Sequence, residues 1–305
     1  MNGGRTAVLV VSYGSSAMVA ENLRRTALPE GAIVVVVDNF TTEGERAAIR
    51  AIAAREGWQL VCPDQNLGFG AGMNAAAERA AESDAETYVL LNPDAFLEED
   101  GVARLSDAVL ADPESVIAPL VVRPDGRHFA SEMELDLDSG SVRRVREGRR
   151  YPDSALWLSG ACLAINRRMW ERVGGFDDDY FLYWEDIDLS VRAAHAGATL
   201  RVDHEARAVH SAGGTQTHDG ETEGKSAVYY FYNVRNRLVF AAQHLDRRRQ
   251  RRWSRRSVPA AWDILMRGGR RQLLHPTRTI VPAVRGTLSG LAYLRRRRRA
   301  AAETP

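Results

Sequence analysis

Cysteine and long apolar stretches are both scarce in this chain of 305 residues. The two cysteines, Cys62 and Cys162, lie far apart and form neither a CxxC metal motif nor the framework of a disulfide-stapled domain. A reducing compartment is the simplest setting for such a sequence. No segment approaches the roughly 18 consecutive apolar residues that a membrane-spanning helix needs. We therefore expect a cytoplasmic protein without a transmembrane helix.

The N-terminal segment also lacks the features of a secretory signal. One arginine precedes the apolar run 7–12, which is too short for the core of a signal peptide and predicts a first strand. Hydrophobic residues make up 45% of the chain, a share typical of folded globular proteins. The length suits one large α/β domain, or such a domain with an added extension.

Acidic residues are almost missing from the C-terminal part of the chain. Residues 1–240 carry 24 basic and 37 acidic side chains, whereas residues 241–299 carry 17 arginines and only two aspartates. Such a division predicts that two parts of the chain face different partners. We therefore expect a main domain over residues 1–240 and a basic, helical extension over residues 241–305.

Short apolar runs alternate with helical segments in the first part of the chain. The runs 6–12, 32–37 and 87–91 are continuous, as expected for strands buried on both faces. A further helix–strand unit covers residues 43–62, and a glycine-containing turn opens an alanine-rich helix that ends near Ala81. This alternation predicts an α/β fold with a mostly parallel sheet.

The second part of the main domain has a weaker pattern. The polar, alternating segment 121–155 predicts a hairpin or loop region over the site. Residues 198–203 predict a short strand with His210 just beyond it, and residues 226–245 predict a helix. After residue 246 the chain is arginine-rich and is broken by three prolines, Pro259, Pro276 and Pro282.

Polar side chains follow the ends of three predicted strands. Asp38, Asn66 and Asp94 each come directly after an apolar run or its turn. Because open α/β sheets bind ligands at the carboxyl edge of their strands, these residues mark a candidate site. Glycines after Asn66 would let backbone N–H groups approach a phosphate, or would serve a tight turn with close helix packing.

Seven segments together carry a resemblance to a known family. The chain resembles the bacterial family 2 glycosyltransferases with a GT-A fold, and most of all their rhamnosyltransferase-like branch. The matching segments, in order, are VVSY (10–13), VVDN (36–39), NLGFGAGMN (66–74), LLNPDA (90–95), SGACLAINR (159–167), VGGFDDDYFLYWEDIDLSVRAAHAG (173–197) and YNVRN (232–236).

The resemblance implies a fold and an activity. The fold would be a GT-A-like, mostly parallel mixed sheet flanked by helices, with a nucleotide-binding half over 1–97 and an acceptor-binding half over 98–240. The activity would be inverting transfer of a sugar from a dTDP- or UDP-linked donor, with rhamnose as the first expectation. The acceptor would be a hydroxyl of a glycan or polyprenyl-linked saccharide in cell-envelope polysaccharide synthesis.

The resemblance also assigns donor contacts. It places Asp38 on the imide N–H of the nucleobase with Tyr13 close by, and it gives Asn66 and Gly68 to the donor nucleotide. Asp38 alone would read as a helix cap or turn aspartate. The family usually continues with Gly-Ser-Thr-Asp after Asn39, whereas this chain has Phe-Thr-Thr-Glu. That departure leaves the base preference open.

A divalent cation, Mg²⁺ or Mn²⁺, is implied at the segment Asn92-Pro93-Asp94. A hard cation can neutralise a departing diphosphate, and the family carries its metal carboxylate at this position. Asp94 would be the direct ligand, with Asn92 in place of the first aspartate of the family motif. The segment is also good turn chemistry, which is compatible with the ligand role. His210 would be the second ligand, with His204 as its rival.

The resemblance gives the chemistry to Asp186. Inverting transfer needs one base that removes the proton of the attacking hydroxyl. Asp186 matches the base of the family, Glu185 would orient the acceptor, and Trp184 would contact its sugar. The alternative is an acidic cluster that is stabilised by the N-terminus of a helix. Aromatic residues are also more often part of a core than of a sugar site.

The arginine-rich extension predicts a surface partner. Basic stretches with interspersed aromatic residues suit an anionic membrane, and nucleic acid would attract them as well. Because the resembled family often acts on polyprenyl-linked sugars, we expect peripheral association with the inner face of the cell membrane. We expect no nucleic-acid partner, and a merely solvated tail is the alternative.

Two other functional classes compete with this interpretation. A nucleotidyltransferase shares a parallel sheet and a metal carboxylate, but it needs a basic glycine-rich loop after the first strand. The segment 13–16 contains no basic residue. A non-catalytic nucleic-acid-binding module would use the arginine extension, and the combined presence of Asp94, Asp186 and His210 argues against it.

Overall fold

The computed structural model describes residues 4–145, 151–211 and 225–303. Its strands are β1 (Arg5–Ser12), β2 (Ile33–Asp38), β3 (Gln59–Val61), β4 (Ala85–Leu91), β5 (Ala95–Leu97), β6 (Ser115–Val122), β7 (His128–Ala130), β8 (Met133–Asp136), β9 (Val142–Arg144), β10 (Ser154–Trp157), β11 (Cys162–Asn166) and β12 (Thr199–His210). Its α-helices are α1 (Ser16–Arg25), α2 (Glu43–Glu56), α3 (Phe69–Ala81), α4 (Gly101–Ala111), α5 (Arg167–Val173), α6 (Glu185–His195), α7 (Ala227–His244), α8 (Arg247–Arg255), α9 (Ser257–Met266) and α10 (Ile280–Glu303), and a 3₁₀ helix, η1, covers Arg270–Leu274.

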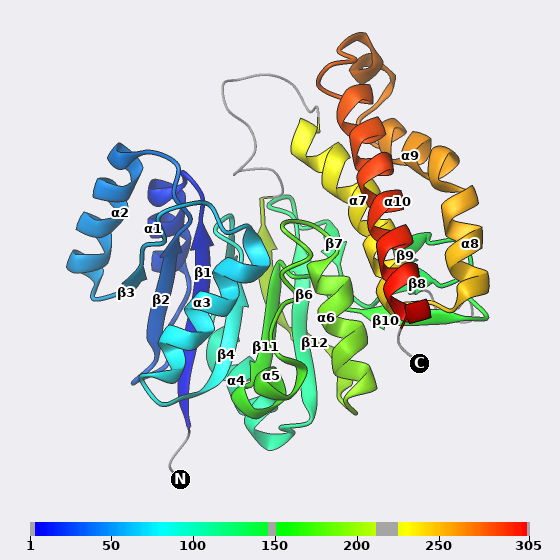
Figure 1. Ribbon diagram of the computed structural model, residues 1–305. Helices are drawn as coiled ribbons and strands as arrows, with labels where there is room; N and C mark the ends of the chain where they lie inside the picture. Colours follow the sequence, from blue (N-terminus) through cyan, green and yellow to red (C-terminus); the bar gives the residue numbers. More distant parts are fainter. Residues whose placement is uncertain (1–3, 146–150, 212–224, 304–305) are drawn as a thin grey trace.

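A nine-stranded sheet lies at the centre of the described structure, in the order β3-β2-β1-β4-β11-β6-β12-β5, with β7 paired to β6 (Figure 1). The first four strands of this order are parallel. Strand β11 then runs antiparallel to both β4 and β6, and β12 is parallel to β6. The fold is therefore α/β as predicted, with a sheet that is parallel from β3 to β4 and mixed beyond β4.

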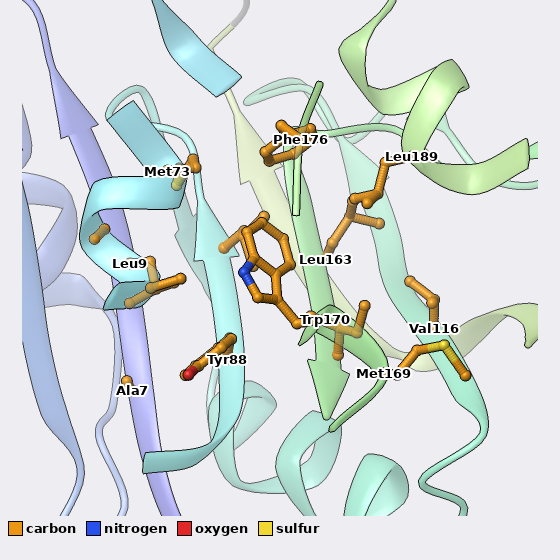
Figure 2. Close-up of a cluster of buried hydrophobic side chains, with 14 of the residues drawn as sticks. Ala7, Leu9, Met73, Tyr88, Val116, Leu163, Met169, Trp170, Phe176 and Leu189 are labelled. Atoms are coloured by element: carbon orange, nitrogen blue, oxygen red, sulfur yellow. The ribbon is translucent and has the colours of Figure 1, made fainter. Parts of the chain in front are cut away.

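Helices cover both faces of this sheet, which explains the continuous apolar strands. On one face, α3, α5 and α6 bury a core that centres on Trp170, and Figure 2 shows its ring among Tyr88, Leu163 and Phe176. On the other face, α1, α2 and α4 bury the alternate residues of the same strands, such as Val8 and Val10 of β1. A strand that is covered on both sides gains from an apolar residue at every position.

The C-terminal helices pack against the main domain. Helix α10 lies along α7, and α8 and α9 flank this pair (Figure 1). Trp253 of α8 and Tyr293 of α10 join one apolar cluster with Trp184 and with the small sheet β10-β8-β9. The extension is helical, as predicted, and residue 240 lies inside α7, so this helix continues across the predicted boundary.

The prolines of the extension lie at its interruptions. Pro259 and Pro282 lie in the first turns of α9 and α10, where the missing N–H has no helical acceptor to lose. Pro276 lies between η1 and α10, so each proline lies close to the start of a helix. Within the described residues, none of the helices combines the length and the apolar content needed to cross a bilayer.

The region before Asp186 and the last strand of the main sheet also differ from expectation. Segment 121–155 contains short strands, as predicted. Strands β8 and β9 pack against the C-terminal helices, whereas β7 lies next to His210. Strand β12 is longer than residues 198–203, and His210 is its last residue. An irregularity between Asp203 and Arg207 interrupts the apolar alternation, which hid the second part of the strand.

Asn74 of α3 joins two motifs that are far apart in sequence. Its Nδ2 donates to the carbonyl of Phe176 at 2.9 Å, and its Oδ1 accepts from the N–H of the same residue at 2.8 Å. The amide side chain thereby satisfies both backbone groups of a residue whose ring is 2% exposed. The segment that precedes α6 is thus fixed to α3.

We expect Asn74→Ala to lower the free energy of unfolding by about 1–3 kcal/mol, because it leaves a backbone donor and acceptor in the interior without partners. Urea denaturation followed by circular dichroism measures this change. Glu78→Ala, at an exposed position of the same helix, is the control and should stay within about 0.5 kcal/mol of wild type. Equal stability of the two variants would contradict the assigned role of Asn74.

Candidate functional site

The predicted site residues lie along the carboxyl edge of the parallel strands. Ser12 and Asp38 are register partners at the ends of β1 and β2. Tyr13 follows β1 and is 44% exposed. The turn with Asn92 and Asp94 follows β4. This edge of the sheet therefore gathers polar groups from several strands, as the sequence predicted.

Asp38 is paired with an arginine that the sequence analysis did not select. Its Oδ2 accepts from Arg46 Nε at 2.6 Å, and both side chains are buried. The Arg46 guanidinium lies over the Phe40 ring, 4.6 Å from its centroid. Arg46 occupies the helical face that also carries Ile49 and Ala53, both buried. A charged residue in that apolar spacing is the signal that could have identified it.

The loop before α3 is shaped for close contact with the segment that precedes α6. Asn66 Oδ1 accepts from the N–H of Gly68, and Asn39 Nδ2 donates to the Gly68 carbonyl, each at 2.8 Å. Gly68 has a φ of +84°, and a Cβ there would lie 2.2 Å from the carbonyl oxygen of Phe181. The N–H of Phe69 donates to that same carbonyl at 2.9 Å. Gly68 therefore serves a close backbone approach.

Asp94 and His210 meet beside the turn that follows β4. Pairing of β5 with β12 brings them together, and His210 Nε2 lies 3.0 Å from Asp94 Oδ1. Asn92 Nδ2 lies 3.4 Å from the same imidazole nitrogen. The Phe129 ring packs edge-on against the imidazole. His204, the rival candidate, is exposed and pairs with Glu132.

The Asp94–His210 pair fits a divalent cation that shares its coordination with a phosphate ligand. It offers a carboxylate and an imidazole, and His210 Nδ1 is buried without a hydrogen-bond partner in the described structure. Residues 4–145, 151–211 and 225–303 contain no cluster of three or more His, Cys, Asp or Glu side chains that could hold a metal by themselves. Magnesium-type sites use one or two carboxylates plus substrate phosphates, so this small donor set is sufficient.

Asp186 is the second residue of α6, and its carboxylate is largely desolvated. Oδ2 accepts from the N–H of Gly160 at 3.1 Å, and Oδ1 accepts from the N–H of Ile187 at 2.9 Å. Burial raises the pKa of Asp186 to about 6, although these hydrogen bonds act in the opposite direction. Burial and the charge of Asp186 raise the pKa of Glu185 well above its usual range. Glu185 Oε2 has no hydrogen-bond partner in the described structure.

A turn with unfavourable backbone angles directly precedes Glu185 and Asp186 and sets the position of their carboxylates. Tyr183 and Trp184 both have left-handed backbones, with φ of +66° and +74°. Asn236 of α7 donates from Nδ2 to the carbonyls of Leu182 and Tyr183, at 2.9 and 2.7 Å. Non-glycine residues in this region cost about 1 kcal/mol or more each, so the turn needs such support.

Trp184 is part of the core. Its side chain is 7% exposed and packs against Phe240 and Trp253, with ring centroids 5.7 and 6.2 Å away. The ring therefore offers no open face for a sugar, and the expected acceptor contact of Trp184 is corrected. The aromatic residue is large because it fills the space between α6, α7 and α8.

The loop 159–161 links Asp186 to the turn that carries Asp94. The N–H of Gly160 binds Asp186, and the carbonyl of Ala161 accepts from the N–H of Asn92 at 3.0 Å. A Cβ on Gly160 would lie 3.3 Å from Asp186 Cβ, so glycine permits the close approach. Two hydrogen bonds through one short loop therefore connect Asp186 to the turn that carries Asp94.

The sheet gathers polar groups at its carboxyl edge, where open α/β sheets bind ligands, and the acidic pair Glu185 and Asp186 begins α6. The chain belongs to the family described as glycosyltransferase like family 2, whose model matches residues 4–218. This membership agrees with the family resemblance found in the sequence, and it does not favour the nucleotidyltransferase or nucleic-acid-binding alternatives.

Characterised relatives share part of the chain. An N-acetylglucosaminyl-diphospho-decaprenol L-rhamnosyltransferase of Mycobacterium tuberculosis H37Rv is 29% identical over 190 residues, which cover 54% of this chain and 61% of the relative. The dTDP-rhamnosyl transferase RfbF of Shigella flexneri is 22% identical over 217 residues, which cover 70% and 71% of the two chains. The chain thus spans less than two thirds of its mycobacterial relative.

Solved structures share the fold. The mannosyltransferase PcManGT of Pyrobaculum calidifontis, in complex with GDP-Man and Mn²⁺, has a TM-score of 0.55 at 17% identity, with 95% of this chain and 85% of that chain covered. GalNAc-T7, with UDP, GalNAc and Mn²⁺, has a TM-score of 0.58 at 14% identity, with 79% and 51% covered. The GT-A-like fold predicted from the sequence is thereby confirmed.

Because the folded state raises the pKa of Asp186, charging this carboxylate disfavours folding. The wild type should lose the corresponding stability as the pH rises from about 4 to about 6. Asp186→Asn does not titrate, so we expect it to exceed wild type in free energy of unfolding by about 1–3 kcal/mol at pH 7, with a smaller difference at pH 4.

Thermal unfolding at several pH values measures this difference. Asp178→Asn, at an exposed position before the same helix, is the control and should follow wild type at every pH. A difference between Asp186→Asn and wild type that does not grow with pH would show that the carboxylate is not desolvated.

Proposed function

We propose that this protein is an inverting, cation-dependent glycosyltransferase that moves a sugar from a nucleoside-diphosphate donor to a hydroxyl acceptor. The observation that supports this most directly is the connection of a desolvated carboxylate, Asp186, to the Asp94–His210 pair through loop 159–161. A base for the acceptor and a cation site for the leaving group are the two elements that such a transfer requires.

Asp186 acts as the general base in this proposal. A pKa of about 6 leaves most of the carboxylate charged at neutral pH while keeping it more basic than an ordinary aspartate. Its two backbone hydrogen bonds fix the direction of its oxygens. Glu185, adjacent and buried, orients the acceptor.

Asp94 and His210 hold the cation, Mg²⁺ or Mn²⁺. When bound, the cation supplies positive charge to the departing diphosphate. Asn92 Nδ2 lies 3.4 Å from His210 Nε2, the nitrogen that faces Asp94, so Asn92 adjoins the proposed cation position. Two transferases of the same fold, PcManGT and GalNAc-T7, have structures with Mn²⁺, which supports a divalent cation.

The donor lies at the carboxyl edge, with its base near Asp38 and Tyr13. Arg46 pairs with Oδ2 of Asp38, and we assign the other carboxylate oxygen to the imide of the base. Asn66 and Gly68 shape the loop before α3, and Asn92 lies at the end of β4 on the same edge of the sheet. We take dTDP- or UDP-linked rhamnose as donor, which the names of the relatives support.

The acceptor is a glycan or a polyprenyl-linked saccharide of the cell envelope, in line with the decaprenol-linked acceptor in the name of the mycobacterial relative. The enzyme acts at the inner face of the cell membrane from the cytoplasmic side. Exposed apolar side chains on α9 and α10, namely Val258, Trp262, Val284 and Leu288, provide a surface for this contact beside several arginines.

Release of nucleoside diphosphate from a panel of nucleotide sugars tests the activity. With Mn²⁺ or Mg²⁺ and a lipid extract as acceptor source, one donor should be consumed, and EDTA should stop the reaction. We expect Asp186→Asn to lower the rate by about 10² to 10⁴, the usual contribution of a general base. Asp94→Asn should remove the stimulation by metal.

Asp178→Asn is the matched control, because it removes an exposed carboxylate from the same segment and should leave the rate unchanged. If the wild type released no more product than Asp186→Asn with every donor, and nucleotides failed to raise its melting temperature, the transferase proposal would be wrong.

The pH profile provides a separate test. Because the base acts when deprotonated, kcat/KM should fall as the pH drops through about 6, to about one-tenth of its plateau at pH 5. Binding of the donor nucleotide, followed by thermal shift over the same range, controls for loss of substrate affinity. A profile that stays flat down to pH 5 would indicate an ordinary carboxylate and exclude this role for Asp186.

A further inference from the structure

A second concentration of charge lies outside the proposed catalytic site. A cavity of about 760 Å³, here called the α8 cavity, adjoins the outer face of α8 and the turn between β8 and β9. Its lining residues are Asp138, Ser139, Arg248, Arg251, Arg252, Arg255 and Arg256. None of them belongs to the carboxyl edge of the main sheet.

The arginines converge because of their spacing on α8. Arg248, Arg251, Arg252 and Arg255 follow the spacing of one helical face, while Trp253 and Gln250 on the other face are buried. Trp253 is 0% exposed, and its Nε1 donates to the carbonyl of Leu137 at 3.0 Å. The α8 cavity therefore has a wall that is fixed by packing.

Most of this positive charge has no acidic partner. Arg252 pairs with Asp138 at 2.6 Å. In the part of the chain that the structure describes, no carboxylate pairs with the other four arginines of the cavity. Behind the wall, Arg237 is 3% exposed, and its Nη2 donates to the carbonyl of Ser139 at 2.8 Å.

Two arginines near the α8 cavity have lowered pKa values, partly because other arginines lie close to them. Burial, and then the charge of Arg256, lower the pKa of Arg237 to about 10. Burial also lowers the pKa of Arg298, and Arg251 and Arg247 add to this effect. Arg298 comes from α10 and reaches α8 through a bond of 2.8 Å from its Nε to Gln250 Oε1. Packing of α7 and α10 thus places two further guanidinium groups, those of Arg237 and Arg298, beside the arginines of α8.

We infer that the α8 cavity binds a phosphate- or diphosphate-bearing ligand, either free in solution or as the headgroup of an anionic lipid. Planar guanidinium groups match phosphate oxygens in paired hydrogen bonds, and a concave site lets several of them reach one group. This inference does not depend on the proposed transferase activity, since it uses other residues on other elements.

Two binding measurements with the full chain test the inference and separate the sources. Calorimetry with inorganic diphosphate, in EDTA so that no cation site contributes, reports a soluble ligand. Cosedimentation with vesicles of phosphatidylcholine, with or without phosphatidylglycerol, reports a lipid headgroup. We expect binding in at least one arm, and we expect it to weaken as salt is added.

The double variant Arg251→Gln/Arg255→Gln should weaken that binding by about tenfold or more, since it removes two charged donors. The matched control, Arg50→Gln/Arg168→Gln, removes two exposed arginines from α2 and α5. It should bind as wild type does, and donor turnover by both double variants should equal that of wild type if the chain is a transferase.

Loss of binding in the first variant alone supports the α8 cavity, whichever arm reports it. Equal binding by wild type and both variants, or no binding of diphosphate and of phosphatidylglycerol vesicles, overturns it. Binding of duplex DNA by these arginines, without either phosphate probe, would also overturn it in favour of a nucleic-acid surface.

Discussion

The geometry of the candidate site depends on two consecutive left-handed residues, Tyr183 and Trp184. They turn the chain so that α6 begins with Glu185 and Asp186 at the edge of the sheet. Such a backbone is unfavourable by itself, and it persists because Asn236 binds two of its carbonyls while the Trp184 ring fills a core. The packing that stabilises the turn also buries the carboxylates of Glu185 and Asp186. The same contacts therefore hold the turn and raise the pKa values of both groups.

Contacts between distant segments also fix the start of α3 to the segment before α6. Backbone groups at 66–69 bind the segment 176–181 directly, and Asn74 adds a side-chain link. Gly68 is required because the carbonyl of Phe181 occupies the space of a side chain. The glycine-containing turn before α3 therefore joins the carboxyl edge of the sheet to the segment before Asp186.

Helices α7 to α10 complete this arrangement. Their apolar residues pack behind the strained turn, with Trp253 in contact with Trp184, while five arginines at α8 line the outer cavity. The acid excess of the main domain and the basic excess of the extension are thus combined in one packed body, with the carboxyl edge on one part and the α8 cavity on another. One packed body can therefore present surfaces of different charge to different partners.

The amino-acid sequence by itself determined the α/β class, the strands over the first hundred residues and the identities of Asp38, Asp94, Asp186 and His210 as polar groups at strand or helix ends. These features are local, because periodicity and turn chemistry act over a few residues. Only the tertiary structure decided that Arg46 forms a salt bridge with Asp38, that Trp184 is buried, and that β12 continues through an irregularity to His210. It also decided which arginines come together around α8. Each of these depends on contacts between segments far apart in the chain, which no local pattern encodes.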